Sequence, residues 1–232
     1  MAVAMTNAQI RAALQHMYAS RSDISDAQYT TYINLALERL ARNHDWFELN
    51  RKADLTLSAS GTAAADKVVS TSGITALRDI YSVVIENSAR SVRLSGMGAA
   101  EFDAAIPLPE YFARNVPQCY TLWTADEMLV HPVPDAAYTM RVRYRKWPAA
   151  LSADADVPEL TRKDDMLIFL TASFIWSLLR EVDEANRYFA YYKNELAGAV
   201  VNADNVPDAR LHPNFLAAGH ALPEYWRTPF LR

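Results

Sequence analysis

The residue types best suited to chemistry gather in residues 127–151, EMLVHPVPDAAYTMRVRYRKWPAAL. His131 could act as a general base or as a metal ligand. Three arginines at alternate positions, Arg141, Arg143 and Arg145, could together bind an anion. The alternative is a β-hairpin, because alternation along a strand places three such side chains on one face without any chemical role.

The hairpin is the simpler interpretation of this stretch. Residues 127–131 and 138–147 both alternate in the way that strands do, and the prolines and Asp135 between them suit a turn. Under this interpretation the three arginines form a solvated or interface-facing edge of a sheet. His131 then ends the first strand and has no chemical partner in the sequence.

Other chemical motifs are missing from the sequence. No histidine pair has metalloprotease spacing, and Ser95 lacks the leading glycine of a nucleophile elbow. Six glycines leave little room for a phosphate-binding loop. The acidic stretch SADADVPE reads as a solvated loop, and the single cysteine, Cys119, as a structural thiol. We therefore expect no catalytic residue, no metal site and no cofactor, and we expect that the protein is not an enzyme.

The composition of the chain limits the kinds of partner that it can bind. Charged residues make up 22% of the 232 residues and hydrophobic residues 51%, as in ordinary globular proteins. The formal net charge of −4 argues against binding nucleic acid by wholesale phosphate neutralisation. The longest apolar run, residues 166–179, is too short to cross a bilayer, so we expect a buried helix and no membrane partner.

Helical patterns lie at both ends of the chain. Thr6 to Gln9 and Ser25 to Gln28 each have the capping-box form, and apolar residues at helical spacing follow each box. A second pair of helices is predicted after Pro158, with stripes over residues 167–179 and 185–199. Two helices therefore precede the middle of the chain and two follow it.

The middle of the chain is rich in strands. Alternating or β-branched segments at residues 54–58, 80–85, 91–94 and 118–123 join the two strands named above. No long helix separates them, which favours antiparallel pairing. The sequence therefore predicts an α+β fold, in which a four-helix core of two N-terminal and two C-terminal helices carries an inserted antiparallel β subdomain. The expected divisions are residues 1–50, 51–157, 158–201 and an extended C-terminal tail, 202–232.

The tail combines prolines with large apolar residues. Four prolines forbid a long helix, whereas a purely solvating tail would be poor in aromatic residues. We therefore expect the tail to pack either on the body of its own chain or on a neighbouring protein. Its candidate contact residues are Pro213, Phe215, Leu216, Tyr225, Trp226 and Phe230.

The order of these elements resembles the head-to-tail adaptor proteins of tailed bacteriophages, also called connector or tail accessory proteins. The resemblance covers roughly residues 25–200. It is carried by the signature Val130-His131-Pro132-Val133-Pro134-Asp135, by Tyr144 at the end of the next strand, and by the helix pair that follows. The segment Ala76-Leu77-Arg78-Asp79 departs from the Leu-Pro-x-Asp of the family.

The resemblance implies a structural protein of the virion neck, made in the host cytoplasm. It implies a homo-oligomeric ring, typically of twelve subunits, beneath the portal protein, with a downstream tail or nozzle protein on the other side. DNA would pass through the lumen without sequence-specific binding, and the tail would dock on the portal. The alternative is another ring component of the neck or tail, such as a stopper or tail-tube protein.

Overall fold

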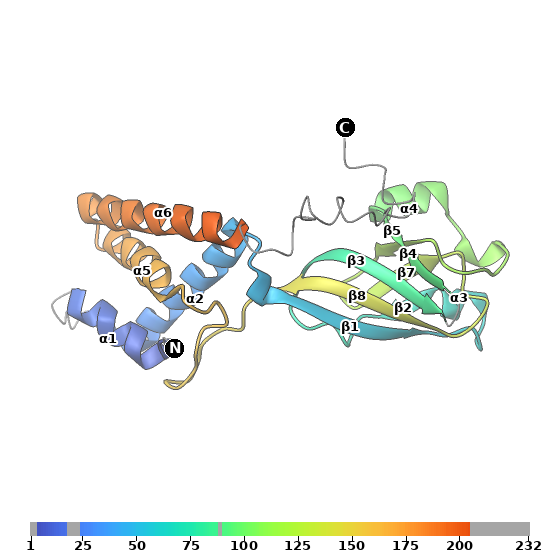
Figure 1. Cartoon of the computed structure of the whole chain (residues 1–232), viewed down its shortest axis with the longest axis horizontal. Helices are drawn as coiled ribbons and strands as arrows, with labels where there is room; N and C mark the ends of the chain where they lie inside the picture. Colours follow the sequence, from blue (N-terminus) through green and yellow to red (C-terminus); the bar gives the residue numbers. More distant parts are fainter. Residues whose placement is uncertain (1–3, 18–23, 88–89, 205–232) are drawn as a thin grey trace, which may run out of the picture.

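The four long helices and the strands occupy separate regions of the molecule (Figure 1). The computed structural model describes residues 4–17, 24–87 and 90–204. Four helices lie in one region: α1 (Asn7–Met17), α2 (Asp26–Asn43), α5 (Asp164–Leu178) and α6 (Val182–Asp204). The strands make up the other region, so the predicted α+β class is confirmed.

Both predicted capping boxes are present. The Ser25 side chain accepts a hydrogen bond from the backbone N–H of Gln28, and the Gln28 side chain accepts one from the N–H of Ser25. Thr6 and Gln9 make the same reciprocal pair at the start of α1. Each box satisfies donors that have no partner inside the helix, which explains why the two helices begin where they do.

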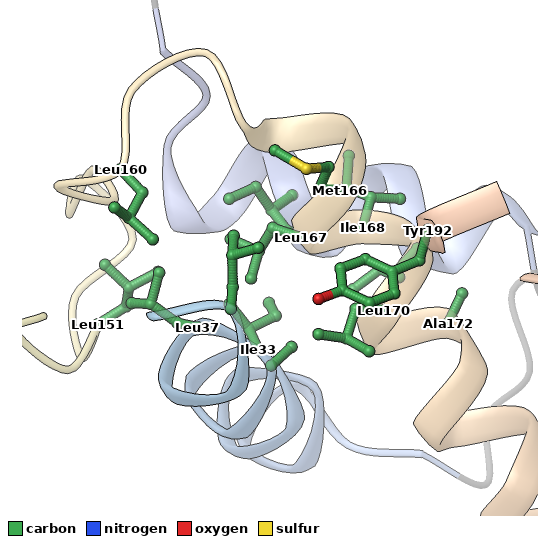
Figure 2. Close-up of a cluster of buried hydrophobic side chains, with 14 of the residues drawn as sticks. Ile33, Leu37, Leu151, Leu160, Met166, Leu167, Ile168, Leu170, Ala172 and Tyr192 are labelled. Carbon is green, nitrogen blue, oxygen red and sulfur yellow. The ribbon is translucent and has the colours of Figure 1, made fainter. Parts of the chain in front are cut away.

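One hydrophobic cluster draws on all four of these helices (Figure 2). Leu37 of α2, Leu170 of α5 and Tyr192 of α6 are almost completely buried. The segment that leads into α5 adds Leu151 and Leu160 to the same cluster. The Tyr192 hydroxyl lies 2.5 Å from the Asn43 amide, so its polar end is also satisfied.

The strands form two four-stranded sheets. Sheet 1 has the order β1-β8-β3-β4 and is antiparallel throughout. Sheet 2 has the order β2-β7-β6-β5, and its two-residue strand β5 pairs in parallel with β6, which is an exception to the predicted antiparallel pairing. The strands are β1 (Asn50–Leu57), β2 (Val68–Ser70), β3 (Leu77–Asn87), β4 (Arg90–Arg93), β5 (Ser95–Gly96), β6 (Cys119–Leu122), β7 (Glu127–His131) and β8 (Tyr138–Lys146).

The predicted hairpin of residues 127–131 with 138–147 is wrong. Both segments are strands, but β7 pairs with β2 and β6, whereas β8 pairs with β1 and β3. The intervening segment therefore crosses between the sheets, and it includes the cis peptide bond between His131 and Pro132. Alternation along a strand specifies which side chains face the core, but it leaves the choice of partner strand open.

A second hydrophobic cluster lies between the two sheets. Met140, Val142 and Ile85 reach it from sheet 1, and Met128 and Val130 reach it from sheet 2. All five are nearly or fully buried. The other face of sheet 1 therefore points away from sheet 2. Short helices complete this region: α3 (Ala63–Asp66), α4 (Ala99–Ala105) and the 3-10 turns η1 (Phe47–Leu49) and η2 (Pro109–Tyr111).

Arg114 ties several loops of the β region together. Its guanidinium donates to the Asp66 carboxylate at 2.9 Å and to the carbonyl oxygens of Gly61 and Pro134 at 2.9 and 3.1 Å. Burial opposes ionisation of Asp66, but hydrogen bonds from Arg114 and from the N–H of Gly61 outweigh it and lower the pKa of this carboxyl. The folded state therefore favours the charged form of Asp66.

The linkage of Asp66 to folding predicts a pH dependence. Because the folded pKa lies below the ordinary value of 3.8, the contribution of Asp66 is present above that value and is lost as the pH falls through the folded pKa. The substitution Asp66→Asn should therefore lower the free energy of unfolding at pH 7, and its effect should shrink below about pH 3.8. Urea unfolding of both proteins at pH 7 and pH 3 measures this. An equal difference at both pH values would contradict the assignment.

Candidate interaction surfaces

His131 and Cys119 do not belong to a reactive site in the described part of the chain. Burial lowers the pKa of His131, and its imidazole makes an edge contact with the Phe112 ring at 5.0 Å between centroids. Burial raises the pKa of the Cys119 thiol, which lies 3.5 Å from the His131 carbonyl oxygen. Both shifts favour the neutral forms of these groups. Their surroundings are those of packed side chains.

Residues 4–17, 24–87 and 90–204 offer neither a set of metal ligands nor a helix that could span a membrane. No group of three or more histidine, cysteine or acidic side chains in these ranges could hold a metal ion. None of the helices in the described ranges is both long enough and apolar enough to cross a membrane.

The three arginines of β8 do share one face, as alternation predicts. They do not form an edge, however, because β8 is an interior strand of sheet 1 between β1 and β3. Two of them make ion pairs within the protein. Arg141 pairs with Asp54 at 2.9 Å and with Glu86, and Arg145 pairs with Asp79 at 2.9 Å and with Asp45.

Arg143 is the exposed member of the three. Its cross-strand neighbours are Lys52 on β1 and Ser82 on β3. Lys52 is also exposed, and neither cation has an ion pair with an acid among the described residues. Of the three predicted interface arginines, Arg143 is therefore the one whose charge is free to meet a partner.

The two hydrophobic clusters meet at a polar junction. Arg78 donates to the carbonyl oxygen of Ala41 at 2.6 Å and pairs with Asp45 at 3.2 Å, which joins the start of β3 to the end of α2. Trp147 lies beneath two guanidinium groups, with the carbon of Arg78 at 5.7 Å and that of Arg42 at 5.9 Å from the ring centroid. These contacts set how the helical region sits against the sheets.

A shielded ion pair lies at the same junction. Glu48 of η1 pairs with Lys163, the residue before α5, and each side chain is only 10% exposed. The Lys163 ammonium also lies 4.5 Å from the centroid of the Trp46 ring. A charge in such a shielded place requires its counter-charge, because water cannot replace it.

Removal of the Glu48 charge should therefore destabilise the protein. The substitution Glu48→Gln preserves size but leaves the Lys163 charge without an acid, and we expect a loss of about 2 kcal/mol in the free energy of unfolding. Glu38→Gln is the matched control, because Glu38 pairs with Arg42 on the exposed surface of α2. Its cost should stay below about 0.5 kcal/mol. Similar costs in urea unfolding would show that the junction pair has no special role.

Two exposed apolar surfaces were not predicted from the sequence. Around η2, Leu108 and Phe112 are each 49% exposed and Tyr111 is 79% exposed. At the turn between β6 and β7, Leu122 and Trp123 are 37% and 48% exposed. The available signal was large apolar residues beside Pro107 and Pro109 and at the end of the predicted strand 118–123, since segments that connect strands lie at the surface.

A groove of about 480 Å³ lies along α2 in the helical region. The α2 residues Leu35 and Glu38 form one side of it, and Trp147 with the following segment forms the other. Leu35 is 49% exposed. The groove is open, and two of its polar side chains are already engaged: the Asn34 amide bonds to the backbone of Leu151, and Glu38 pairs with Arg42. It therefore lacks the convergent polar groups of a small-molecule site.

Among the described residues, the notable exposed features are apolar and charged surfaces. A family model described as the SU10 adaptor protein matches residues 5–214, which is most of the chain. The chain therefore belongs to the SU10 adaptor protein family, a family of phage head-to-tail adaptors, and the resemblance seen in the sequence is confirmed. A search among curated proteins found no match.

The predicted tail contacts lie outside the described residues. Helix α6 continues to Asp204, so the first three residues of the predicted tail belong to a helix. The family match ends at residue 214, and five of the six predicted contact residues lie beyond it. They are Phe215, Leu216, Tyr225, Trp226 and Phe230.

Proposed function

We propose that this protein forms a homo-oligomeric ring between the portal of a phage capsid and the next tail component. The observation that carries the proposal is the family match over residues 5–214. The ring, typically of twelve subunits in proteins that it resembles, would surround the channel through which DNA passes. DNA would make no sequence-specific contact with it, and no cofactor would be needed.

Each region of the chain has a proposed part in this assembly. The four helices of residues 1–50 and 158–201 form the core of the ring, a proposal supported by their shared hydrophobic cluster. The β subdomain of residues 51–157 faces the downstream tail or nozzle protein. The exposed apolar residues around η2 support this role, because large apolar side chains are frequent anchors in protein interfaces. The tail after α6 docks on the portal.

The mass of the assembly with and without a portal protein tests the proposal. Native mass spectrometry of the protein mixed with portal should show a complex of several copies of this chain bound to the portal ring. Mixing with the downstream tail protein should yield a second complex. If the chain bound only the tail protein and never the portal, the alternative of a stopper or tail-tube component would replace the adaptor role.

A further inference from the structure

The outer face of sheet 1 carries three exposed cations, Lys52, Arg93 and Arg143, that make no ion pair with an acid among the described residues. Lys52 of β1 lies directly opposite Arg143 of β8. Arg93 of β4 lies opposite Val84, which in turn lies opposite Arg141. Strand alternation therefore places all of these side chains on the face that points away from sheet 2. We name Lys52, Arg93 and Arg143 the basic face.

The basic face lacks internal neutralisation, unlike its surroundings. The flanking Arg141 and Arg145 are paired with acids of β1, β3 and the junction. Among the described residues, Lys52 and Arg143 have no acidic partner, and the hydrogen bond of Arg93 goes to the Tyr81 carbonyl oxygen. Like charges directly opposite in a sheet destabilise it. An anionic partner that covered the face would relieve this repulsion.

The turn between β6 and β7 has complementary properties. Asp126 and Glu127 are exposed there and make no ion pair with another described residue, and beside them lie the exposed Leu122 and Trp123. We name residues 122–127 the acidic turn. It thus offers two carboxylates within four residues of an exposed tryptophan, whereas the basic face offers cations, of which Arg93 bonds the backbone of the exposed Tyr81. Arginine stacks well on tryptophan, so the two surfaces are complementary in charge and in the types of their side chains.

The acidic turn is held in shape before it meets a partner. The carbonyl oxygen of Glu127 accepts from the N–H groups of Trp123 and Thr124 at 3.0 and 3.2 Å. Thr71 anchors the turn from outside, with its hydroxyl donating to the Ala125 carbonyl and its N–H to that of Asp126, both at 2.9 Å. A turn fixed in this way loses little conformational freedom on binding.

We propose that the acidic turn of one copy binds the basic face of the next copy. This inference rests on the proposed ring and names a contact that would close it. The two surfaces are distinct patches on different sheets, so one copy can use both at once, as a head-to-tail contact requires. DNA is the less suitable occupant, because three free cations on a chain of net charge −4 give a weak phosphate footprint.

Charge reversal and charge exchange test the contact in the full-length chain. Sedimentation velocity over a range of concentrations at low salt measures self-association. Reversal of one side, either Lys52→Glu with Arg143→Glu or Asp126→Lys with Glu127→Lys, should weaken it by about tenfold or more. The chain that carries all four substitutions should associate within a few fold of the original, because the exchanged charges match again. Far-UV circular dichroism verifies that each variant is folded.

A matched control comes from helix α4. Glu101→Lys with Asp103→Lys makes the same change in net charge at two other exposed acids and should leave self-association unchanged. Unchanged association after either reversal, failure of the four-residue exchange, or a monomeric original protein at every concentration would overturn the inference. The inference would also be overturned if the charge reversals abolished binding to DNA or to the tail protein but left self-association unchanged. Portal binding, measured separately, reports on the proposed function itself, so the two ideas can fail independently.

Discussion

Deletion of residues 205–232 is expected to abolish binding to the portal while the rest of the chain stays folded. The deleted segment holds all six predicted contact residues, among them Trp226 and Phe230. Aromatic anchors of this kind dominate the binding free energy when they are buried at an interface. The folded part should survive because the helical cluster is built from residues that precede the deletion. Binding of the truncated chain to immobilised portal protein measures the loss.

Single substitutions test whether the aromatic side chains of the tail, and not the tail in general, are responsible for portal binding. Trp226→Ala in the full-length chain should weaken portal binding by about 2 kcal/mol or more, which is roughly thirtyfold. Tyr111→Ala removes an exposed aromatic side chain at η2 and serves as the control, with portal binding unchanged. If the truncated protein bound the portal as well as the full chain, the tail would have another role.

Substitution Leu170→Ala is expected to cost about 3–4 kcal/mol of the free energy of unfolding. Leu170 is fully buried in the cluster shared by the four helices. Removing most of its side chain forfeits both the transfer free energy and the packing contacts of the cavity wall. A loss of this size is a large part of the stability of an ordinary domain. Urea unfolding followed by circular dichroism at 222 nm, a wavelength sensitive to helix, is the measurement.

The same helix supplies the control for this substitution. Leu178 lies at the last residue of α5 and is 53% exposed, so Leu178→Ala makes the same chemical change without opening a cavity. Its effect should remain within about 0.5 kcal/mol. Equal costs at the two positions would mean that the helical cluster contributes little to stability, and the proposed helical core of the ring would lose its main support.

The helices were predictable because local signals specify them. The capping boxes at Thr6 and Ser25 satisfy helix donors with side chains only three residues away, so the sequence alone shows where the helices begin. The buried stripe of α2, including Ile33, Leu37 and Leu40, also follows directly from helical spacing. The strands β3 and β8 were found for the same reason, since alternation is a local pattern.

The pairing of the strands was not predictable in this way. β7 and β8 are neighbours in the sequence and looked like a hairpin, yet they belong to different sheets. Which strand pairs with which depends on burial across the whole region between the two sheets. No short stretch of sequence contains that information.

The arginines of β8 separate what the sequence determines from what only the tertiary structure decides. The sequence by itself determined that Arg141, Arg143 and Arg145 share a face, because side chains alternate along any strand. Only the tertiary structure decided that Arg141 and Arg145 are neutralised by acids far away in the chain, whereas Arg143 is left beside Lys52. The physical reason is that alternation acts between residues two positions apart, whereas ion pairs depend on partners that only folding brings within reach.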